Sequence, residues 1–368
     1  MLEIRIKKIT IILSILLIAP TSGFAVESKE EQLLKILGDF PTPPALQLET
    51  LESVKLDGGW RHKIEYVAEK ADPLFGRAID KVRAYLFVPD HNEAQQLPAI
   101  VAIHQDGPHT HLGKSEPAGL AGEPNQHYGL ELFKRGYVVI CPDRFPHAER
   151  RRIPNSETAG SDTMRDLNLW LRWSGQLILS GRTYFGKEVY DLMRAVDVLC
   201  TYDFVDKERI GAIGHSAGGN ILVYFMFVDK RVQVGVSSCG FFELVDFYGE
   251  ASTSFSNSVF ALPGLTKIGI SADYLALLAP RPFLMTRGLW EYGKASDTEQ
   301  NKSRKHVAET ETIERYVRQR YSQLNAGDNL KVIYFDENGG NHDFPPKVKQ
   351  QAYLWLDSYL KKVPGKGK

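Results

Sequence analysis

The sequence predicts an α/β fold, in which a mostly parallel central sheet carries helices on both faces. From Leu97 onward, short apolar runs alternate with longer segments of helical pattern, which is typical of βα units. The runs are almost continuously Val, Ile and Leu, as strands must be when helices cover both faces of a sheet. The 368 residues are also enough to bury a substantial core.

The segments before Leu97 have a different pattern. An amphipathic stretch over residues 30–40 is followed by "PTPPAL", which cannot continue a helix. Three segments with a period of two come next, and they cover residues 48–56, 61–69 and 81–90. We expect them to open the sheet as antiparallel strands.

The later elements follow in regular alternation. Strands are expected at 97–104, 136–143, 209–215, 232–240, 281–288 and 330–336. Helices are expected at 127–135, 186–203, 217–228, 299–325 and 346–361. Right-handed crossovers between the parallel strands would place these helices on both faces of the sheet.

One connection, residues 144–187, is too long for this pattern. It starts basic and polar and becomes rich in aromatic residues. A loop of this length usually has a function or a structure of its own, so we predict a cap insertion over one end of the sheet. No internal repeat is evident, and residues 26–368 are predicted to form one α/β domain.

The first 25 residues have the three-part form of a secretory signal: charged "MLEIRIKK", apolar "ITIILSILLIA", and small residues up to Ala25. The apolar run is shorter than the ~20 residues that span a bilayer. We therefore predict a signal peptide at 1–25 and a periplasmic or secreted protein, with no membrane attachment after cleavage.

Charge and cysteine content exclude other classes. Lys plus Arg equals Asp plus Glu, at 45 each, so no net field favours nucleic acid. Three cysteines are too few for a disulfide scaffold. Cys141, Cys200 and Cys239 lie in or beside apolar segments, and we expect buried free thiols. No cofactor is expected.

The string "RIGAIGHSAGGNILVYFMF" places Ser216 between two glycines, where an apolar run ends and a helical run begins. The G-x-S-x-G pattern alone is weak, but a strand, a tight turn and a helix form the context of the nucleophile elbow of α/β-hydrolases. These enzymes order their triad as serine, acid and histidine. His342, in a glycine-rich loop after the last strand, is therefore the predicted base. His306, in a charged helical run, is interpreted as a solvated surface residue.

The acid is less sharply defined than the serine and the histidine. Glu291 lies three residues beyond the glycine that ends the 281–288 strand, where many α/β-hydrolases carry the acid. Asp297 in the same loop is the nearest competitor. Glu243 and Asp246, after the preceding strand, are an alternative placement.

The oxyanion hole needs two main-chain donors. Ala217, directly after the nucleophile, should supply one N–H. The second should come from Gln105 or Asp106, in the turn after the 97–104 strand, and the sequence leaves this choice open. The same turn carries a possible set of zinc ligands, His104, Asp106, His109 and His111. Without a second cluster downstream, we interpret it as a polar loop and expect no metal.

Several longer strings carry a family resemblance: "HLGKSEPAGLAGEPNQHYGLELFKRGYVVICPD", "GRTYFGKEVYDLMRAVDVL", "VDKERIGAIGHSAGGN", "LAPRPFLMTRG" and "NHDFP". From about Leu51 onward the chain resembles the dienelactone hydrolase and acetyl xylan esterase-like branch of the α/β-hydrolase superfamily. The resemblance implies a serine hydrolase with Ser216 and His342 in its triad. The chain departs from dienelactone hydrolases proper, which use cysteine as nucleophile, and from the commoner aspartate at the position of Glu291.

These features predict a carboxylic-ester hydrolase that acts through an acyl-enzyme on short acyl esters, with acetylated carbohydrate as a candidate substrate. Six aromatic and basic side chains of the cap are candidate sugar contacts; the alternative is that the aromatic ones form the core of the cap and the basic ones a solvated turn. They are Trp170, Trp173, Tyr184, Arg150, Arg151 and Arg152. The alternatives are a prolyl-oligopeptidase-like peptidase, although no room remains for a propeller, and a catalytically silent α/β-hydrolase used for binding.

Overall fold

The computed structural model describes residues 27–106, 110–150, 159–241, 243 and 261–361. The predicted signal peptide, residues 1–25, lies outside these ranges. Within them, no helix is both long enough and apolar enough to cross a membrane.

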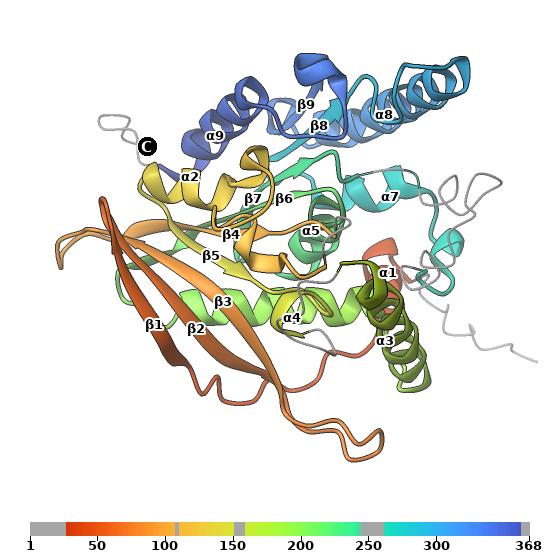
Figure 1. The fold of residues 1–368 in the computed structure, drawn as a ribbon. Coiled ribbons are helices and arrows are strands. Elements are labelled where there is room, and N and C mark those ends of the chain that lie inside the picture. Colours follow the sequence, from red (N-terminus) through yellow and green to blue (C-terminus); the bar gives the residue numbers. More distant parts are fainter. Residues whose placement is uncertain (1–26, 107–109, 151–158, 242, 244–260, 362–368) are drawn as a thin grey trace, which may run out of the picture.

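A nine-stranded sheet forms the centre of the molecule, in the order β1-β2-β3-β5-β4-β6-β7-β8-β9 (Figure 1). Its strands are β1 (Glu49–Leu56), β2 (Gly59–Glu69), β3 (Asp80–Pro89), β4 (Leu97–Ile103), β5 (Val138–Pro142), β6 (Val205–His215), β7 (Val232–Ser238), β8 (Phe283–Gly288) and β9 (Leu330–Phe335). The pairs β1–β2, β2–β3 and β3–β5 are antiparallel, and every later neighbour is parallel. The sheet therefore opens with the antiparallel strands that the sequence predicts.

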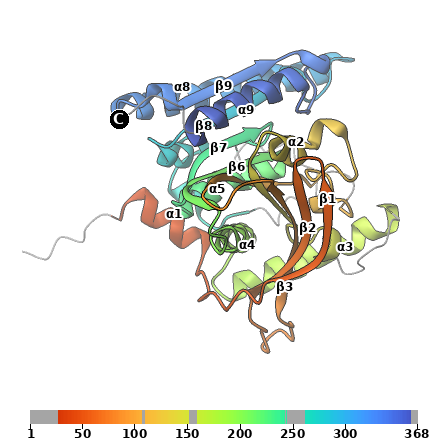
Figure 2. The same ribbon diagram turned by 90° about the vertical axis from the view of Figure 1, so that its left-hand side faces the viewer.

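Helices cover both faces of this sheet (Figures 1 and 2). On one face, α2 (Tyr128–Lys134) and α9 (Pro346–Leu360) share an apolar core with the strands. The other face carries α1 (Lys29–Leu37), α4 (Tyr184–Leu199), α5 (Ala217–Val228), α7 (Ser271–Leu275) and α8 (Asp297–Gln323). Every residue of β4 and β5 is buried, as strands between two helical layers must be. The predicted α/β fold with a mostly parallel sheet is confirmed.

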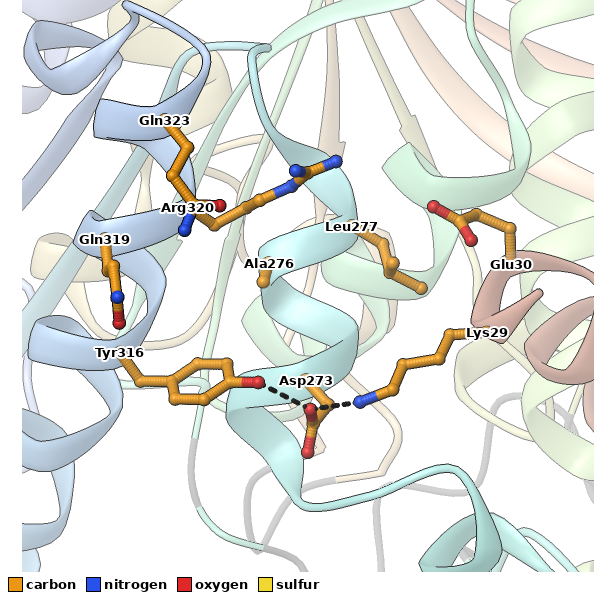
Figure 3. Close-up of a pocket in the computed structure, with 9 residues that line it drawn as sticks. All are labelled: Lys29, Glu30, Asp273, Ala276, Leu277, Tyr316, Gln319, Arg320 and Gln323. Atoms are coloured by element: carbon orange, nitrogen blue, oxygen red, sulfur yellow. Dashed lines mark hydrogen bonds and ion pairs between the residues drawn. The ribbon is translucent and has the colours of Figure 1, made fainter.

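Helix α1 is fixed to the domain at both of its ends. Ser28 and Glu31 form a capping box at its start, and Leu33 and Leu37 are buried in the core beneath it. Figure 3 shows a cleft of about 320 Å³ between α1, α7 and α8. On its wall the Asp273 carboxylate accepts hydrogen bonds from Lys29 Nζ at 2.5 Å and from the Tyr316 hydroxyl at 2.8 Å. The N-terminal helix is thus part of the domain.

The predicted cap, residues 144–187, contains α3 (Ala159–Leu179) and the first turn of α4. Helix α4 belongs to the sheet layer, because Val189, Ala195 and Val196 are buried in the main core. Around α3 lies a smaller cluster of its own, in which Trp170 packs with Phe145 and Tyr184. Residues 151–158 are outside the described ranges, and the cap remains a prediction.

Candidate active site

Ser216 lies in the turn between β6 and α5, in a backbone conformation that L-residues rarely adopt, with φ 53° and ψ −125°. Its N–H donates to Ser238 O at 2.8 Å, and its carbonyl accepts from the N–H of Asn220 at 3.0 Å. Its side chain does not cap the helix. Ser216 and Ala217 are partly exposed, whereas His215 before them and Gly218 after them are buried. Strained backbone that surrounding contacts enforce is typical of functional sites.

The two glycines around Ser216 are needed for close packing. A Cβ on Gly218 would lie 2.4 Å from Ile103 O and 2.6 Å from His104 O. A Cβ on Gly214 would lie 2.4 Å from Gly218 O. Real Cβ atoms do not approach backbone oxygen this closely, so the helix start can contact both β6 and the end of β4 only because both positions are glycine.

His342 follows β9 and lies beside this turn. Its ring centre is 4.9 Å from that of His215, the residue before Ser216. Its Nδ1 is 2.9 Å from Glu291 Oε2. Because an ionised carboxylate only accepts, Nδ1 must carry the proton, and a neutral ring then has its lone pair on Nε2. This is the tautomer that a general base requires.

Glu291 is almost fully buried, with 4 % of its side chain exposed. Its Oε2 also accepts from Arg287 Nη1 at 2.9 Å, and its Oε1 accepts from the N–H of Gly288 at 2.9 Å. Burial alone would raise the pKa of Glu291. The charge of Arg287, the nearby ring of His306 and the hydrogen bond from His342 outweigh burial and hold that pKa well below its usual range. Glu291 is therefore a carboxylate fixed on three sides.

The interpretation of His306 as a solvated surface residue is wrong. This residue of α8 is 9 % exposed, and its Nε2 lies 3.7 Å from Glu291 Oε2. Its neighbours at helical spacing, Thr310, Ile313 and Val317, are buried as well. The buried face of α8 therefore brings a second histidine to the acid. Together with the buried Ser303 these residues are spaced three and four positions apart, as on one face of a helix. This spacing can be seen in the sequence, but the many charged residues between them obscure it.

The two other candidate acids that the structure describes lie away from His342. Asp297 is exposed at the start of α8. Glu243 accepts hydrogen bonds from the N–H and hydroxyl of Ser271, at the start of α7. Asp246 is outside the described residues. Among the four carboxylates considered, the structure places Glu291 beside His342.

The predicted oxyanion donors lie where β4 and β6 end side by side. Ala217 is the first residue of α5, where a helix leaves its N–H groups without intrahelical acceptors. Gln105 and Asp106 follow directly after His104, whose carbonyl is in close contact with Gly218. The two turns that carry these residues are therefore adjacent.

The histidine loop is held by a residue that the sequence did not single out individually. The Asp343 carboxylate accepts from Asn125 Nδ2 and from Asn338 Nδ2, each at 2.7 Å. Asp343 thereby ties the loop of His342 to the turn before α2. It is part of the "NHDFP" string, which was the only signal pointing to it.

Comparisons with known proteins agree with this architecture. A model of the prolyl oligopeptidase family matches residues 181–265. The solved structure of a "putative acetyl xylan esterase" from Bacteroides fragilis NCTC 9343 superposes with a TM-score of 0.63 and 19% identity, over 90% of this chain and 83% of that one. A glucuronoyl esterase from Solibacter usitatus has a TM-score of 0.58 and 16% identity, over 90% and 91%. The chain has the α/β-hydrolase fold.

A relative covers nearly the same length. "Putative hydrolase YtaP" of Bacillus subtilis (strain 168) is 24% identical over 335 residues, which are 90% of this chain and 99% of that protein. In the α/β-hydrolase fold described here, the prolyl oligopeptidase match spans α4, β6, the Ser216 turn and β7. The match therefore centres on the elbow and leaves out Glu291 and His342.

The loop considered for zinc is held by hydrogen bonds in this α/β-hydrolase fold. His104 Nδ1 lies 2.6 Å from Gln105 O, and its Nε2 accepts the N–H of Arg144 at 2.9 Å. The Asp106 carboxylate accepts from Arg144 Nη1 at 2.8 Å. His109 lies outside the described residues. Both nitrogens of His104 are thus engaged within the protein.

The cap side chains proposed as sugar contacts are mostly buried, which corrects that hypothesis. Trp170 is 7% and Tyr184 is 2% exposed, and Trp173 stacks on Phe145 with ring centres 3.9 Å apart. The Arg150 side chain is 4% exposed and pairs with Asp80 and Asp191. These four side chains pack within residues 144–187 and, through Arg150, join this segment to β3 and α4. Arg151 and Arg152 lie outside the described residues.

The cysteines are free thiols. Cys141 and Cys239 are buried as expected, whereas Cys200 is only half-buried. Cys239 lies behind the histidine, and its Sγ–H donates to Asp343 O at 3.4 Å. Burial and the charge of Glu291 raise its pKa well above the usual range, so Cys239 is a neutral thiol and no competing nucleophile.

Proposed function

We propose that this protein is a serine-dependent carboxylic-ester hydrolase that acts through an acyl-enzyme. One observation carries the proposal: the strained strand-to-helix turn that carries Ser216 lies beside His342, whose Nδ1 is hydrogen-bonded to a buried carboxylate. This is the constellation that activates a hydroxyl for attack on a carbonyl.

In the first half-reaction, Ser216 Oγ attacks the ester carbonyl while His342 Nε2 takes the hydroxyl proton. Glu291 stabilises the resulting imidazolium, and the N–H of Ala217 with one from Gln105 or Asp106 stabilises the oxyanion. The intermediate collapses to an acyl-serine, and the alcohol leaves with the proton from His342. In the second half, His342 deprotonates water, which attacks the acyl group and releases the acid and free Ser216.

A fluorophosphonate probe tests the nucleophile directly. The native protein should gain the mass of one adduct, and peptide mapping should place that adduct on Ser216. The Ser216→Ala variant should gain none. An adduct elsewhere, or none on the folded native protein, would contradict the proposal and favour the catalytically silent binding protein.

A peptidase is the second candidate, because the matching family model is that of prolyl oligopeptidases. Amides are harder to cleave than esters, so a comparison at constant acyl group separates the two functions. We expect hydrolysis of p-nitrophenyl acetate and no detectable hydrolysis of p-nitroacetanilide or of a prolyl p-nitroanilide. Faster cleavage of the prolyl substrate would reverse the order of the candidates.

For the substrate, we propose short acyl esters, with acetylated carbohydrate as the first class to test. The name of one structural neighbour, a "putative acetyl xylan esterase", supports both parts of this proposal. That of another, a glucuronoyl esterase, supports only the carbohydrate part, and the buried cap aromatics support neither. The p-nitrophenyl acetate, butyrate and palmitate series and acetate release from acetylated xylan test both parts. Preference for palmitate would overturn the proposal of short acyl esters. Hydrolysis of p-nitrophenyl acetate without release of acetate from xylan would overturn the proposal of acetylated carbohydrate.

A further inference from the structure

The turn after β4 is held by a buried arginine from the next strand end. Arg144 follows β5, and its side chain is 2% exposed. Its Nη1 donates to His104 O at 3.1 Å and to Asp106 Oδ1 at 2.8 Å. One guanidinium nitrogen thus bridges a main-chain oxygen and a side chain, on either side of Gln105.

Arg144 is itself fixed to a rigid element. Its Nε and Nη2 donate to the two carboxylate oxygens of Glu188, at 2.9 and 3.0 Å. The hydroxyl of Tyr184 donates to the same carboxylate at 3.0 Å. Glu188 is part of α4, which packs on the sheet. The planar fork of arginine fits this two-sided arrangement, whereas the point charge of lysine does not.

The same contacts set the orientation of one N–H group. Nε2 of His104 accepts the Arg144 N–H, so the neutral ring must carry its proton on Nδ1 and donate it to Gln105 O, 2.6 Å away. The 105–106 peptide bond is trans, and its N–H therefore points away from that carbonyl. The ring and the guanidinium together fix the direction of the Asp106 N–H.

The charge of Asp106 also has to be controlled. A carboxylate beside a developing oxyanion would raise the barrier, because like charges repel strongly in a site of low dielectric constant. The ion pair with Arg144 turns the Asp106 carboxylate to the buried side of the turn and compensates its charge.

We propose that Arg144 is a positioning residue for the oxyanion site, and that the donor it positions is the main-chain N–H of Asp106. The inference rests on the proposed function. It assigns the second oxyanion donor, which the sequence leaves open between Gln105 and Asp106. It also gives a catalytic role to the ion pair of Arg144 with Asp106, which lies outside the proposed triad.

The test is Arg144→Lys, with Arg182→Lys as the matched control. Arg182 also forms a two-bond pair with a glutamate, Glu69, at 2.8 and 2.9 Å, and among the described residues it makes no hydrogen bond or ion pair with the turn after β4. Misplacing one donor should lower kcat on p-nitrophenyl acetate by about 10- to 100-fold, with KM within about twofold. The affinity for an alkyl boronic acid, which forms a tetrahedral adduct, should fall by a similar factor. Arg182→Lys should lose thermal stability but keep its kcat.

Asp106→Ala keeps the test decisive if Arg144→Lys does not fold, because it leaves the Arg144–Glu188 pair intact. It should lower kcat by about tenfold at unchanged KM. If Arg144→Lys and Asp106→Ala both keep the kcat of Arg182→Lys, or raise only KM, the positioning role is overturned. Ser216→Ala, measured in the same series, separates the two failures: hydrolysis that does not depend on Ser216 overturns the proposed function itself.

Discussion

At the scale of single residues, the proposed triad should behave as one unit. Ser216→Ala and His342→Ala should each lower kcat/KM on p-nitrophenyl acetate by at least about 1000-fold, and the double variant should be no worse than either, because neither residue works without the other. Circular dichroism melting should show that all three variants fold. Multiplicative losses in the double variant would mean that the residues act independently.

The acid assignment has a matched comparison within one loop. Glu291→Gln should lower kcat by about 100-fold or more, because a neutral amide no longer stabilises the imidazolium form of His342. Asp297→Asn should be within about twofold of the native kcat, since Asp297 is exposed at a helix start. Steady-state kinetics on both variants decide the point. A larger loss in Asp297→Asn would show that the alignment of this loop is wrong.

How much of the site could be predicted depends on how local each signal is. Ser216 is recognised by its five-residue motif between a predicted strand and a predicted helix. Glu291 is recognised by its distance from the end of a strand, and His342 by its place in the loop after the last strand. The roles of Arg144 and Asp343 could not be predicted in this way, because their partners are distant in the sequence. Arg144 contacts His104, 40 positions before it, and Asp343 contacts Asn125, 218 positions before it. The sequence around Arg144 does not indicate which main-chain carbonyl will accept its hydrogen bond.

At the scale of elements, the predicted strands and helices exist and their ends shift by a few residues. Helix α4 starts at Tyr184, two residues before the predicted 186, because the hydroxyl of Thr183 accepts the N–H of Gly186 as an N-cap. Strand β6 starts at Val205 instead of 209, because Val205 pairs with Leu97 of β4 before the register shifts to the pair of Ile210 with Ala99. Apolar periodicity finds the buried centre of an element and misses ends that polar contacts define.

Helix α1 offers a stability test on adjacent leucines. Leu33 is 1% exposed and Leu34 is 41% exposed. Leu33→Ala should lower the free energy of unfolding by about 2–5 kcal/mol, because it leaves a cavity in the core. Leu34→Ala should change it by less than about 0.5 kcal/mol. Urea denaturation measures both; equal effects would mean that α1 is not anchored as described.

At the scale of the whole molecule, the export prediction concerns the start of the mature chain. Protein from the native host should begin near Val26 and be found outside the cytoplasm, because the charged start, the apolar run and the small residues act together as a signal. N-terminal sequencing after cell fractionation checks this. An intact Met1 on protein in the cytosolic fraction would contradict the prediction.

The overall architecture was predictable because the sheet follows the chain in regular alternation. The position of α1 was not, since Lys29 of α1 pairs with Asp273 of α7, a carboxylate that also accepts a hydrogen bond from Tyr316 of α8. Amphipathicity shows that a helix has an apolar face, but it does not say which part of the domain will cover that face.

The contact between Lys29 and Asp273 spans 244 positions of sequence, which gives the fold a temporal order during synthesis. At a translation rate of about 15 residues per second, α1 emerges roughly 15 to 20 seconds before Asp273 and Tyr316 have been made. Until then Lys29, at the start of α1, lacks its native ion-pair partner, whereas the end of the helix already has Thr183, whose hydroxyl donates to Leu37 O. A targeting factor or translocase that binds a nascent chain by its first residues would therefore meet α1 before all of its native contacts exist. The contact of Lys29 with Asp273 can form only after Asp273 has left the ribosome.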